Sequence, residues 1–570
     1  MKYMKLGSKP DTFYTEDATR SVLSDVPSDL TIHINNTKYL LHKFPLLLKC
    51  GLLQRLCPDS VDLSSPSPIE LHDIPGGEEA FEVCAKFCYG ITISLSAHNI
   101  VPTLCAAKFL RMTESIARGN LVPKLEAFLD ACVVHGWKDS VVALHASDGV
   151  HAWSENLGII RRCTESIIDK ILTHPSKVTW SYTYTRPGYS ERPHRSVPKD
   201  WWTEDISEIS IDHFRSIISA VRSAKKLHPG LIGEALHVYA CKNLPEPPNA
   251  DRMEEEALAK HRRVLESIVS MIPGEPGSVS GRFLLRLLKE ARYLEASPST
   301  KAELVRRSGR QLDEATVGDL LFPADPSSAS RPFDVDLVGE ILESFMVRFR
   351  HRMGVPMGQE DREAMVKSMS RVARLIDLYL QEIASDPSVP ASKIFDLVEA
   401  CPEFARQEHD HLYRAIDAYL KGHPELNKAD KKHLCSALDC KKLSKDARMH
   451  AIRNDRLPLR TVVQLLFIEQ EESPGDPMMQ TTARRDGKST QLVKDREGQR
   501  ERGEPSSSVM KVDDDKMEKH MAKVNARVVD RLERLEEKAI TEEVEKKKED
   551  MNLRNEGGSG SKVKVKTRTR

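Results

Sequence analysis

The sequence predicts a small α+β domain near the N-terminus followed by a mainly α-helical domain, and then a disordered linker and a short coiled coil. Three observations predict this organisation. Apolar and polar residues alternate from Leu30 to Ile34, as in a half-buried strand. From Trp201 to about Gln470, nearly every apolar pattern has helical spacing. Beyond Glu471 the chain becomes polar and poor in aromatic residues.

We expect the α+β domain to span residues 29–115, after an N-terminal extension of residues 1–28. The first ordered element is predicted to begin at about Asp29. Asn35 and Asn36 tolerate positive φ and are therefore expected to turn the first strand into a hairpin. The other expected elements are a helical pair over residues 46–56, a short apolar segment around residues 69–71, and helices over residues 77–89 and 100–112.

A helical extension (residues 116–175) and a proline-containing linker (residues 176–198) are expected to lead into an all-helical domain over residues 199–470. Four signals inside that domain mark helix ends. Ser280 is placed to begin one helix, Asp410 to cap a second that ends at Gly422 and Pro424, and Pro458 to lie in the first turn of the last.

The remaining residues are predicted to form a disordered linker (471–515), a coiled coil (516–555) and a basic tail (556–570). The heptad pattern is short, so a single exposed helix is the alternative. Its core positions are Met521, Asn525, Val528, Leu532, Leu535 and Ala539. The tail either contacts an anionic membrane surface or stays solvated, and its cations are Lys562, Lys564, Lys566, Arg568 and Arg570.

Composition narrows the class of protein. The 570 residues include 85 basic and 85 acidic side chains, so the formal net charge is zero and a global basic field for nucleic acid is absent. No secretory signal or membrane-spanning segment is recognisable, and the eleven cysteines contain no CxxC pair. We therefore expect a cytoplasmic protein with reduced thiols that binds no nucleic acid.

No catalytic motif stands out. The run from Gly277 to Gly281 has serines on either side of the position that a nucleophile elbow requires, so we interpret it as a loop before a helix. His409 and His411 flank Asp410, but no matching pair lies nearby, which favours a solvated helix start over a metal site. The sequence predicts no enzyme activity, no cofactor and no metal.

Three segments are distinctive. They run from Pro198 through Trp201, Trp202 and Asp205 to Ile209, from His411 through Asp417 to Pro424, and from Leu434 through Pro458 to Phe467. Together they closely resemble the signature of the plant non-phototropic-hypocotyl-three (NPH3) domain family. The order of features over residues 29–115 resembles the BTB (POZ) fold, and the phrase from Met4 to Phe13 looks most like the "naked pins" auxin-related branch.

The resemblance implies an adaptor of a cullin-based ubiquitin ligase in auxin or phototropic signalling. The BTB domain would dock a cullin scaffold, and the helical domain or tail would engage a membrane receptor kinase or a transporter-complex protein. BTB self-association, with the coiled coil, would build a homo- or heterodimer. Tyr413 matches a tyrosine that the family is reported to phosphorylate, and the alternative is that its ring only packs in the helical core.

Two other functions compete with the adaptor. The first is a non-enzymatic scaffold of a plasma-membrane polarity complex that transfers no ubiquitin, with peripheral contact to anionic lipid. The second is a transcriptional co-regulator, which the absence of zinc-finger motifs and of a concentrated basic helix disfavours.

Overall fold

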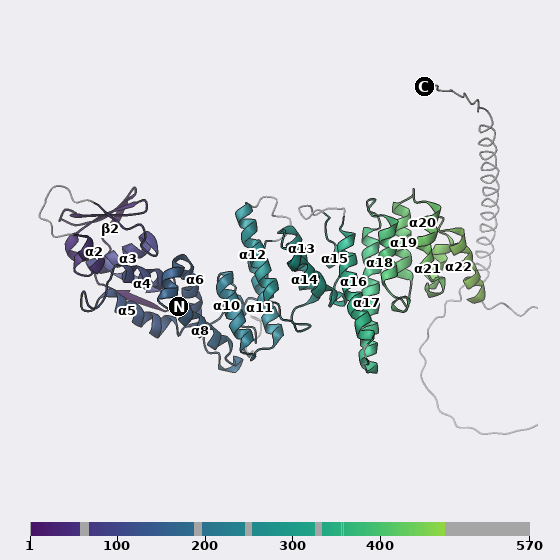
Figure 1. Ribbon diagram of the computed structural model, residues 1–570, viewed down its shortest axis with the longest axis horizontal. Coiled ribbons are helices and arrows are strands. Elements are labelled where there is room, and N and C mark those ends of the chain that lie inside the picture. The colour runs from purple at the N-terminus through teal and green to yellow at the C-terminus, as the bar shows by residue number, and fades with distance from the viewer. Residues whose placement is uncertain are drawn as a thin grey trace, which may run out of the picture. The chain divides into compact units, whose positions relative to one another are not determined.

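The computed structural model describes residues 2–57, 68–186, 196–245, 254–324, 333–354, 356 and 358–472, and all structural statements concern these residues. The chain divides into a unit of residues 1–476 and a second of residues 477–570. The predicted coiled coil and basic tail, and nearly all of the predicted disordered linker, lie outside the described residues. Figure 1 shows the helices and strands.

The N-terminal region contains a five-stranded mixed sheet with the strand order β2-β3-β5-β4-β6. β3 and β5 are parallel, as are β4 and β6, whereas the other two pairs are antiparallel. The predicted hairpin is confirmed, because Asn35 has a φ of 50° between β4 and β5. The strands are β2 (Phe13–Glu16), β3 (Thr19–Val22), β4 (Leu30–Ile34), β5 (Thr37–Leu41) and β6 (Ile69–Glu70).

The prediction that order begins at about Asp29 is wrong. β1 (Tyr3–Leu6) forms an antiparallel pair with β7 (Ile93–Ser96), and β2 and β3 extend the larger sheet. Gly7 has a φ of +90°, and a Cβ there would lie 2.2 Å from the carbonyl oxygen of Ile91. These strands escape a sequence pattern because each has only four residues, none of them fully buried in β1 to β3.

Four helices complete this region, and α3 follows the predicted range from Gly77 to Tyr89. Its buried face packs on the sheet, where the rings of Phe81 and Tyr39 lie edge to face with centroids 4.9 Å apart. The mixture of short strands and helices confirms a small α/β region before the helical part. The helices are α1 (Lys43–Leu47), α2 (Gly51–Leu56), α3 (Gly77–Tyr89) and α4 (Ile100–Phe109).

The rest of the described chain is mainly helical, as predicted. The first helices after α4 are α5 (Leu121–Phe128), the π-helix η1 (Leu129–Val133), α6 (Trp137–Ala146), α7 (His151–Asn156) and α8 (Ile159–Ile171). The next are α9 (Thr203–Ile206), α10 (Ile211–Ser223), α11 (Pro229–Asn243), α12 (Glu255–Met271), α13 (Gly281–Tyr293), α14 (Pro298–Gly309) and α15 (Val317–Leu320). The last are α16 (Val335–Met353), α17 (Gln359–Ile383), α18 (Ala391–Ala400), α19 (Asp410–Gly422), α20 (Lys428–Ser436), α21 (Lys445–Ile452) and α22 (Leu459–Glu472).

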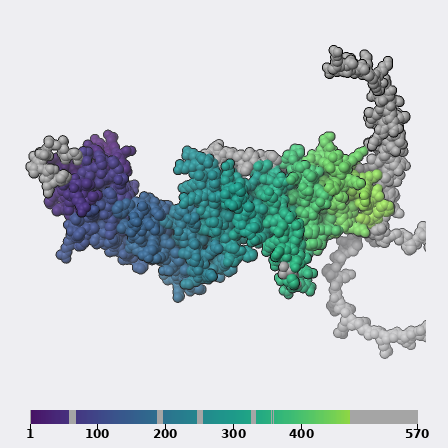
Figure 2. Space-filling model, viewed as in Figure 1, coloured from purple at the N-terminus to yellow at the C-terminus, as the bar shows by residue number. Residues whose placement is uncertain are grey.

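These helices pack mainly on neighbours in the sequence. α13 contacts α14, α14 contacts α16, and α17 contacts α19, which is the order in which they stand in Figure 1. The surface colours accordingly change gradually from teal to green in Figure 2. None of the described helices is both long enough and apolar enough to cross a lipid bilayer.

The predicted helix ends differ in outcome. Ser280 caps α13, since its side chain accepts a hydrogen bond from the backbone N–H of Phe283. Asp410 does not cap α19, and that prediction is wrong, because Asp410 lies inside the first turn and accepts hydrogen bonds from Ser444 instead. Pro458 lies directly before α22, not within it, and its carbonyl accepts from Thr461.

Candidate functional site

Trp201, the first residue of the predicted tryptophan pair, lies in a cluster of aromatic rings directly before α9. Trp201 and Trp202 are buried. The ring of Trp201 packs edge to face on Trp137 of α6, with centroids 4.6 Å apart, and on Trp180, at 5.6 Å. Tyr182 lies 5.7 Å from the same ring. Side chains from three separate segments therefore share one apolar core.

Asp205 provides the polar centre of this cluster. Its side chain is buried, and Oδ2 accepts a hydrogen bond of 2.6 Å from Nε1 of Trp137. The same oxygen accepts one of 3.2 Å from the backbone N–H of Thr183. A buried carboxylate and a buried indole N–H each need a partner, so this arrangement satisfies both at once. We call the cluster formed by Trp137, Trp180, Trp201 and Asp205 the Trp–Asp junction.

The described part of the predicted linker is held against this junction. Residues 178–186 form neither helix nor strand. The backbone N–H of Thr185 donates to both carboxylate oxygens of Glu204, at 2.9 and 3.0 Å. Arg186 forms ion pairs of 2.7 Å with Asp200 and Glu234. The segment thus fills the space between the helical extension and the helical domain.

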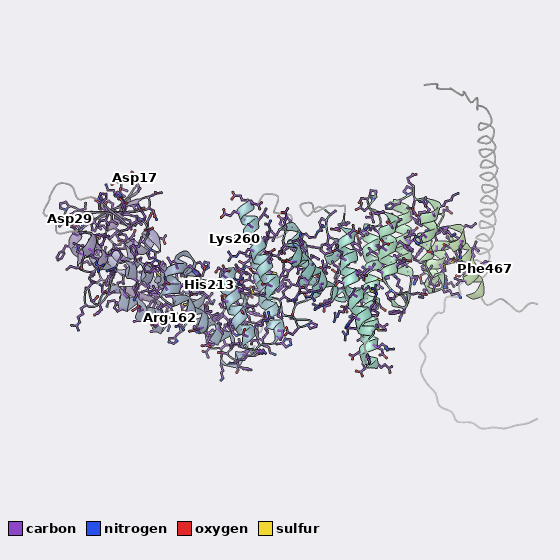
Figure 3. All side chains as sticks on the ribbon, in the orientation of Figure 1. Asp17, Asp29, Arg162, His213, Lys260 and Phe467 are labelled. Carbon is purple, nitrogen blue, oxygen red and sulfur yellow. The ribbon has the colours of Figure 1, made fainter. Side chains whose placement is uncertain are left out.

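A second contact joins the same two regions. His213 of α10, labelled in Figure 3, is buried, and its Nε2 lies 3.1 Å from Oδ1 of Asp148. Asp148 also accepts a hydrogen bond from Ser210, at 3.1 Å. Burial lowers the pKa of His213, while the Asp148 carboxylate raises it, and the net direction is downward. The helical extension is therefore packed on the helical domain at two places.

A pocket of about 650 Å³ opens beside the Trp–Asp junction, between residues 183–186, α9 and α11. Cys241 lines it, with its sulfur 3.7 Å from Nε2 of His237 and 3.0 Å from Nη1 of Arg286. The hydrogen bond from His237 lowers the pKa of Cys241, which increases the thiolate fraction. Among the described residues, no group of three or more His, Cys, Asp or Glu side chains is arranged to hold a metal ion.

Tyr413 lies in a second polar cluster, between α19 and α21. The residue is 2% exposed, and its hydroxyl lies 2.6 Å from Nδ1 of His450 and accepts a hydrogen bond of 3.2 Å from Asn454. Burial raises the pKa of this hydroxyl. Phosphorylation of Tyr413 would require the hydroxyl to leave both partners, and it stays a prediction.

A further predicted signature residue, Asp417, belongs to the same cluster. Asp417 accepts hydrogen bonds from Asn454, at 2.5 Å, and from Nε and Nη2 of Arg456, at 2.9 and 2.8 Å. Pro424 follows the end of α19, and Pro458 precedes α22. Asp417 and Asn454 together tie α19 to the turn before α22, and the two prolines lie where helices stop and start.

His409 has a structural role before α19. Its ring is buried, and Nδ1 accepts a hydrogen bond of 3.1 Å from the backbone N–H of Asp439. If the ring were protonated, its Nδ1–H would point at the backbone N–H of Asp439, and two donors would face each other. Burial, with the nearby cations of Lys442 and Arg406, lowers the pKa of His409 to about 4.

The signature residues therefore fall into two groups. Trp201 and Asp205 belong to the Trp–Asp junction, whereas Tyr413 and Asp417 meet near α21. Trp202 is buried next to Trp201 in the sequence. No hydrogen bond or ion pair within the described ranges connects the groups. Sequence reasoning did not identify the partners Trp137, Thr183, His450, Asn454 and Arg456. For Trp137, the only signal in the sequence was a single tryptophan at the start of a predicted helix.

The fold and these two clusters define a class of protein, one with a small α/β region packed through a helical extension on a long helical domain. Residues 200–448 match the model of the NPH3 family. A BTB/POZ domain-containing protein of Arabidopsis thaliana is 54% identical over 477 residues, which cover 83% of this chain and 85% of that protein.

Two further Arabidopsis thaliana relatives are similar over most of their length. Phototropic-responsive NPH3 family protein NPY2 is 41% identical over 82% of this chain and 77% of its own. Root phototropism protein 3 is 36% identical over 81% of this chain and 76% of its own. The chain belongs to the plant NPH3 family, whose relatives also carry BTB/POZ names. Its place in the naked pins branch stays a prediction.

Replacing Asp205 with Ala should loosen the Trp–Asp junction. The indole N–H of Trp137 and the backbone N–H of Thr183 would lose their acceptor, which costs about 2 kcal/mol of unfolding free energy. Urea unfolding followed by tryptophan fluorescence measures this loss. Asp212→Ala is the matched control, because Asp212 is half exposed in its ion pair with Arg263. Equal effects of the two substitutions would contradict the role given to Asp205.

His409 should make the protein less stable in acid. The unfolded chain takes up a proton at the usual histidine pKa of 6.5, whereas the folded chain resists protonation until about pH 4. Stability is therefore lost as the pH falls from 6.5 to 4, by about 3 kcal/mol, with no further loss from this group below pH 4. Thermal unfolding between pH 7 and 4 should show a shallower slope for His409→Gln. Parallel slopes would count against this assignment.

Proposed function

We propose that this protein is a non-enzymatic adaptor of a cullin-based ubiquitin ligase in plant signalling. In this proposal the N-terminal region is a BTB domain that docks the cullin, and the helical domain recruits the protein to be modified. Membership of the NPH3 family, with relatives that carry BTB/POZ names, supports it. A relative named root phototropism protein 3 supports a signalling context.

The observation that carries the proposal is the attachment of the α/β region to the helical domain through buried contacts. An adaptor must hold two macromolecules at a defined spacing, and a mobile connection between its two parts would not do so. α4 packs on α6, and Trp137 of α6 bonds to Asp205 of the helical domain. These contacts give each bound protein a fixed position relative to the other.

The N-terminal region also has an apolar surface suited to binding a protein. Phe44 and Leu48 in or just after α1 are 75% and 53% exposed, and Leu56 at the end of α2 is 43% exposed. α1 and α2 are in contact. Exposed large apolar side chains that gather on neighbouring elements are typical of protein interaction surfaces. We assign this surface, Phe44, Leu48 and Leu56, to the docking of the cullin or of a second BTB domain.

The recruited partner is proposed to be a membrane receptor kinase or a transporter-complex protein, with the adaptor in the cytoplasm or at the periphery of the plasma membrane. The basic tail, from Lys562 to Arg570, would add weak contact with anionic lipid. Residues 516–555 would support dimerisation. The alternative function is a scaffold of a membrane polarity complex that needs the same helical domain but no cullin.

A pull-down with the N-terminal domain of a cullin tests the proposal on the full-length protein. The wild type should be retained at micromolar concentration, and Phe44→Ser with Leu48→Ser should reduce retention about tenfold, because two exposed anchors are lost. Phe467→Ser is the matched control, since Phe467 is also exposed but lies on α22 (Figure 3).

Light scattering of the same variants separates cullin docking from self-association, because only the loss of a dimer changes the molar mass. No retention of the wild-type protein by any cullin of the same plant would contradict the ligase proposal. The scaffold would then be the better proposal, provided that the variant with both Phe44→Ser and Leu48→Ser still supports membrane polarity in plants.

A further inference from the structure

A second pocket, of about 510 Å³, lies in the helical domain away from the Trp–Asp junction. Its walls come from α16, α17 and the chain that follows α14, elements that stand beside one another in Figure 1. Four arginines line it, namely Arg310, Arg348, Arg352 and Arg371. None of the predicted signature residues is part of this pocket.

Three of these arginines lack an acidic partner. Arg371 forms an ion pair with Asp313, but Arg310, Arg348 and Arg352 form no ion pair with any residue in the described ranges. Arg348 donates instead to the carbonyl oxygen of Arg310. Burial lowers the pKa of Arg348, and the neighbouring Arg352 and Arg310 lower it further. The Asp313 carboxylate acts on the pKa of Arg348 in the opposite direction without forming an ion pair with it. Guanidinium groups that lie together and have no ion-pair partner of their own favour an anion between them.

The pocket also has an apolar wall. Phe345, Phe349 and Met365 line it and are largely buried. The ring of Phe349 is stacked on Phe404, with centroids 6.0 Å apart, and Phe404 is itself exposed. An apolar side chain of a ligand would therefore find a surface next to the arginines. A free inorganic anion would leave this wall unused.

The charges of the lining favour a peptide carboxylate over a phosphate group. Three acidic residues, Asp313, Glu314 and Asp361, also line the pocket, so four arginines against three carboxylates leave a formal charge of +1. A phosphate dianion would lie near these carboxylates and be repelled more strongly than a singly charged carboxylate. The acidic groups can in turn pair with a basic or amide group of a peptide.

We propose that this pocket binds an acidic peptide segment of a partner protein, with its carboxylates on Arg310, Arg348 and Arg352 and an apolar side chain against Phe349. The inference deepens the proposed function by naming the chemistry of the recruited partner. It rests on that function only for the claim that the bound peptide belongs to a recruited protein. Binding to the pocket requires no cullin. Arginine pairs with carboxylates through two parallel hydrogen bonds, which gives the interaction direction as well as strength.

Affinity selection with peptide libraries tests the inference on the full-length protein. One library has two fixed glutamates among randomised positions, a second has glutamines at those positions, and a third has phosphoserines. The wild type should retain the glutamate library about a hundredfold more than the glutamine library, because two charge-assisted contacts are lost and each loss weakens binding about tenfold. Retained peptides should be enriched in Leu, Met or Phe near the glutamates.

Two variants locate the binding. Arg348→Ala with Arg352→Ala should abolish the preference for glutamate, and Arg352→Glu should do so from an exposed position that disturbs no described hydrogen bond. Arg350→Ala is the matched control on the same helix, because Arg350 is exposed, pairs with Glu343 and does not line the pocket. Circular dichroism should show that all variants keep the helical content of the wild type.

Several outcomes would overturn the inference. These are equal retention of the glutamate and glutamine libraries by the wild type, a glutamate preference that survives in Arg352→Glu, or a stronger preference for phosphoserine. Binding of phosphatidylserine vesicles through the same arginines without peptide retention would assign the pocket to lipid. Cullin retention is measured separately. If the wild type binds the cullin but shows no preference for acidic peptides, the inference about the pocket fails and the proposed function stands.

Discussion

The hydrogen bond between Trp137 and Asp205 is the constraint on which the arrangement of the two folded parts depends. Both groups are buried, and the same carboxylate oxygen also accepts a hydrogen bond from the backbone N–H of Thr183. Breaking the bond to Trp137 without admitting water would leave a buried indole N–H unpaired and the buried carboxylate with one donor fewer, which is unfavourable. The helical extension therefore stays packed on the helical domain, and the segment of residues 178–186 is fixed between them.

This constraint gives the family signature a physical explanation. The adjacent tryptophans supply buried ring surface directly before α9, a four-residue helix that could not bury much on its own. Asp205 then fixes which surface of α6 they contact, since a carboxylate bonds only where a donor is placed. The Tyr413–Asp417 cluster acts in a similar way farther along the chain, where it ties α19 to the turn before α22. Both clusters position helices, which suits a protein that binds other proteins through folded surfaces.

Much of this architecture could be predicted from the sequence. The hairpin at Asn35, the helix from Gly77 to Tyr89 and the cap at Ser280 follow from local patterns that tertiary contacts reinforce. The strands before Asp29 could not be predicted, because they are short, partly exposed and defined by pairing with distant residues. Asp410 was misassigned because Ser444, a residue 34 positions away, donates hydrogen bonds to its carboxylate. The tryptophan pair was recognised, but its partners Trp137 and Thr183 depend on packing that no local spacing encodes.

Hydrogen exchange of the wild-type protein, followed by mass spectrometry, tests most directly whether the two folded parts are held together. Residues 137–146, 178–186 and 200–206 should exchange slowly and with similar protection, although the middle segment has no helix or strand of its own. Exchange of residues 178–186 at the rate of an unstructured peptide, with α6 still protected, would show that the extension and the helical domain are not fixed to each other.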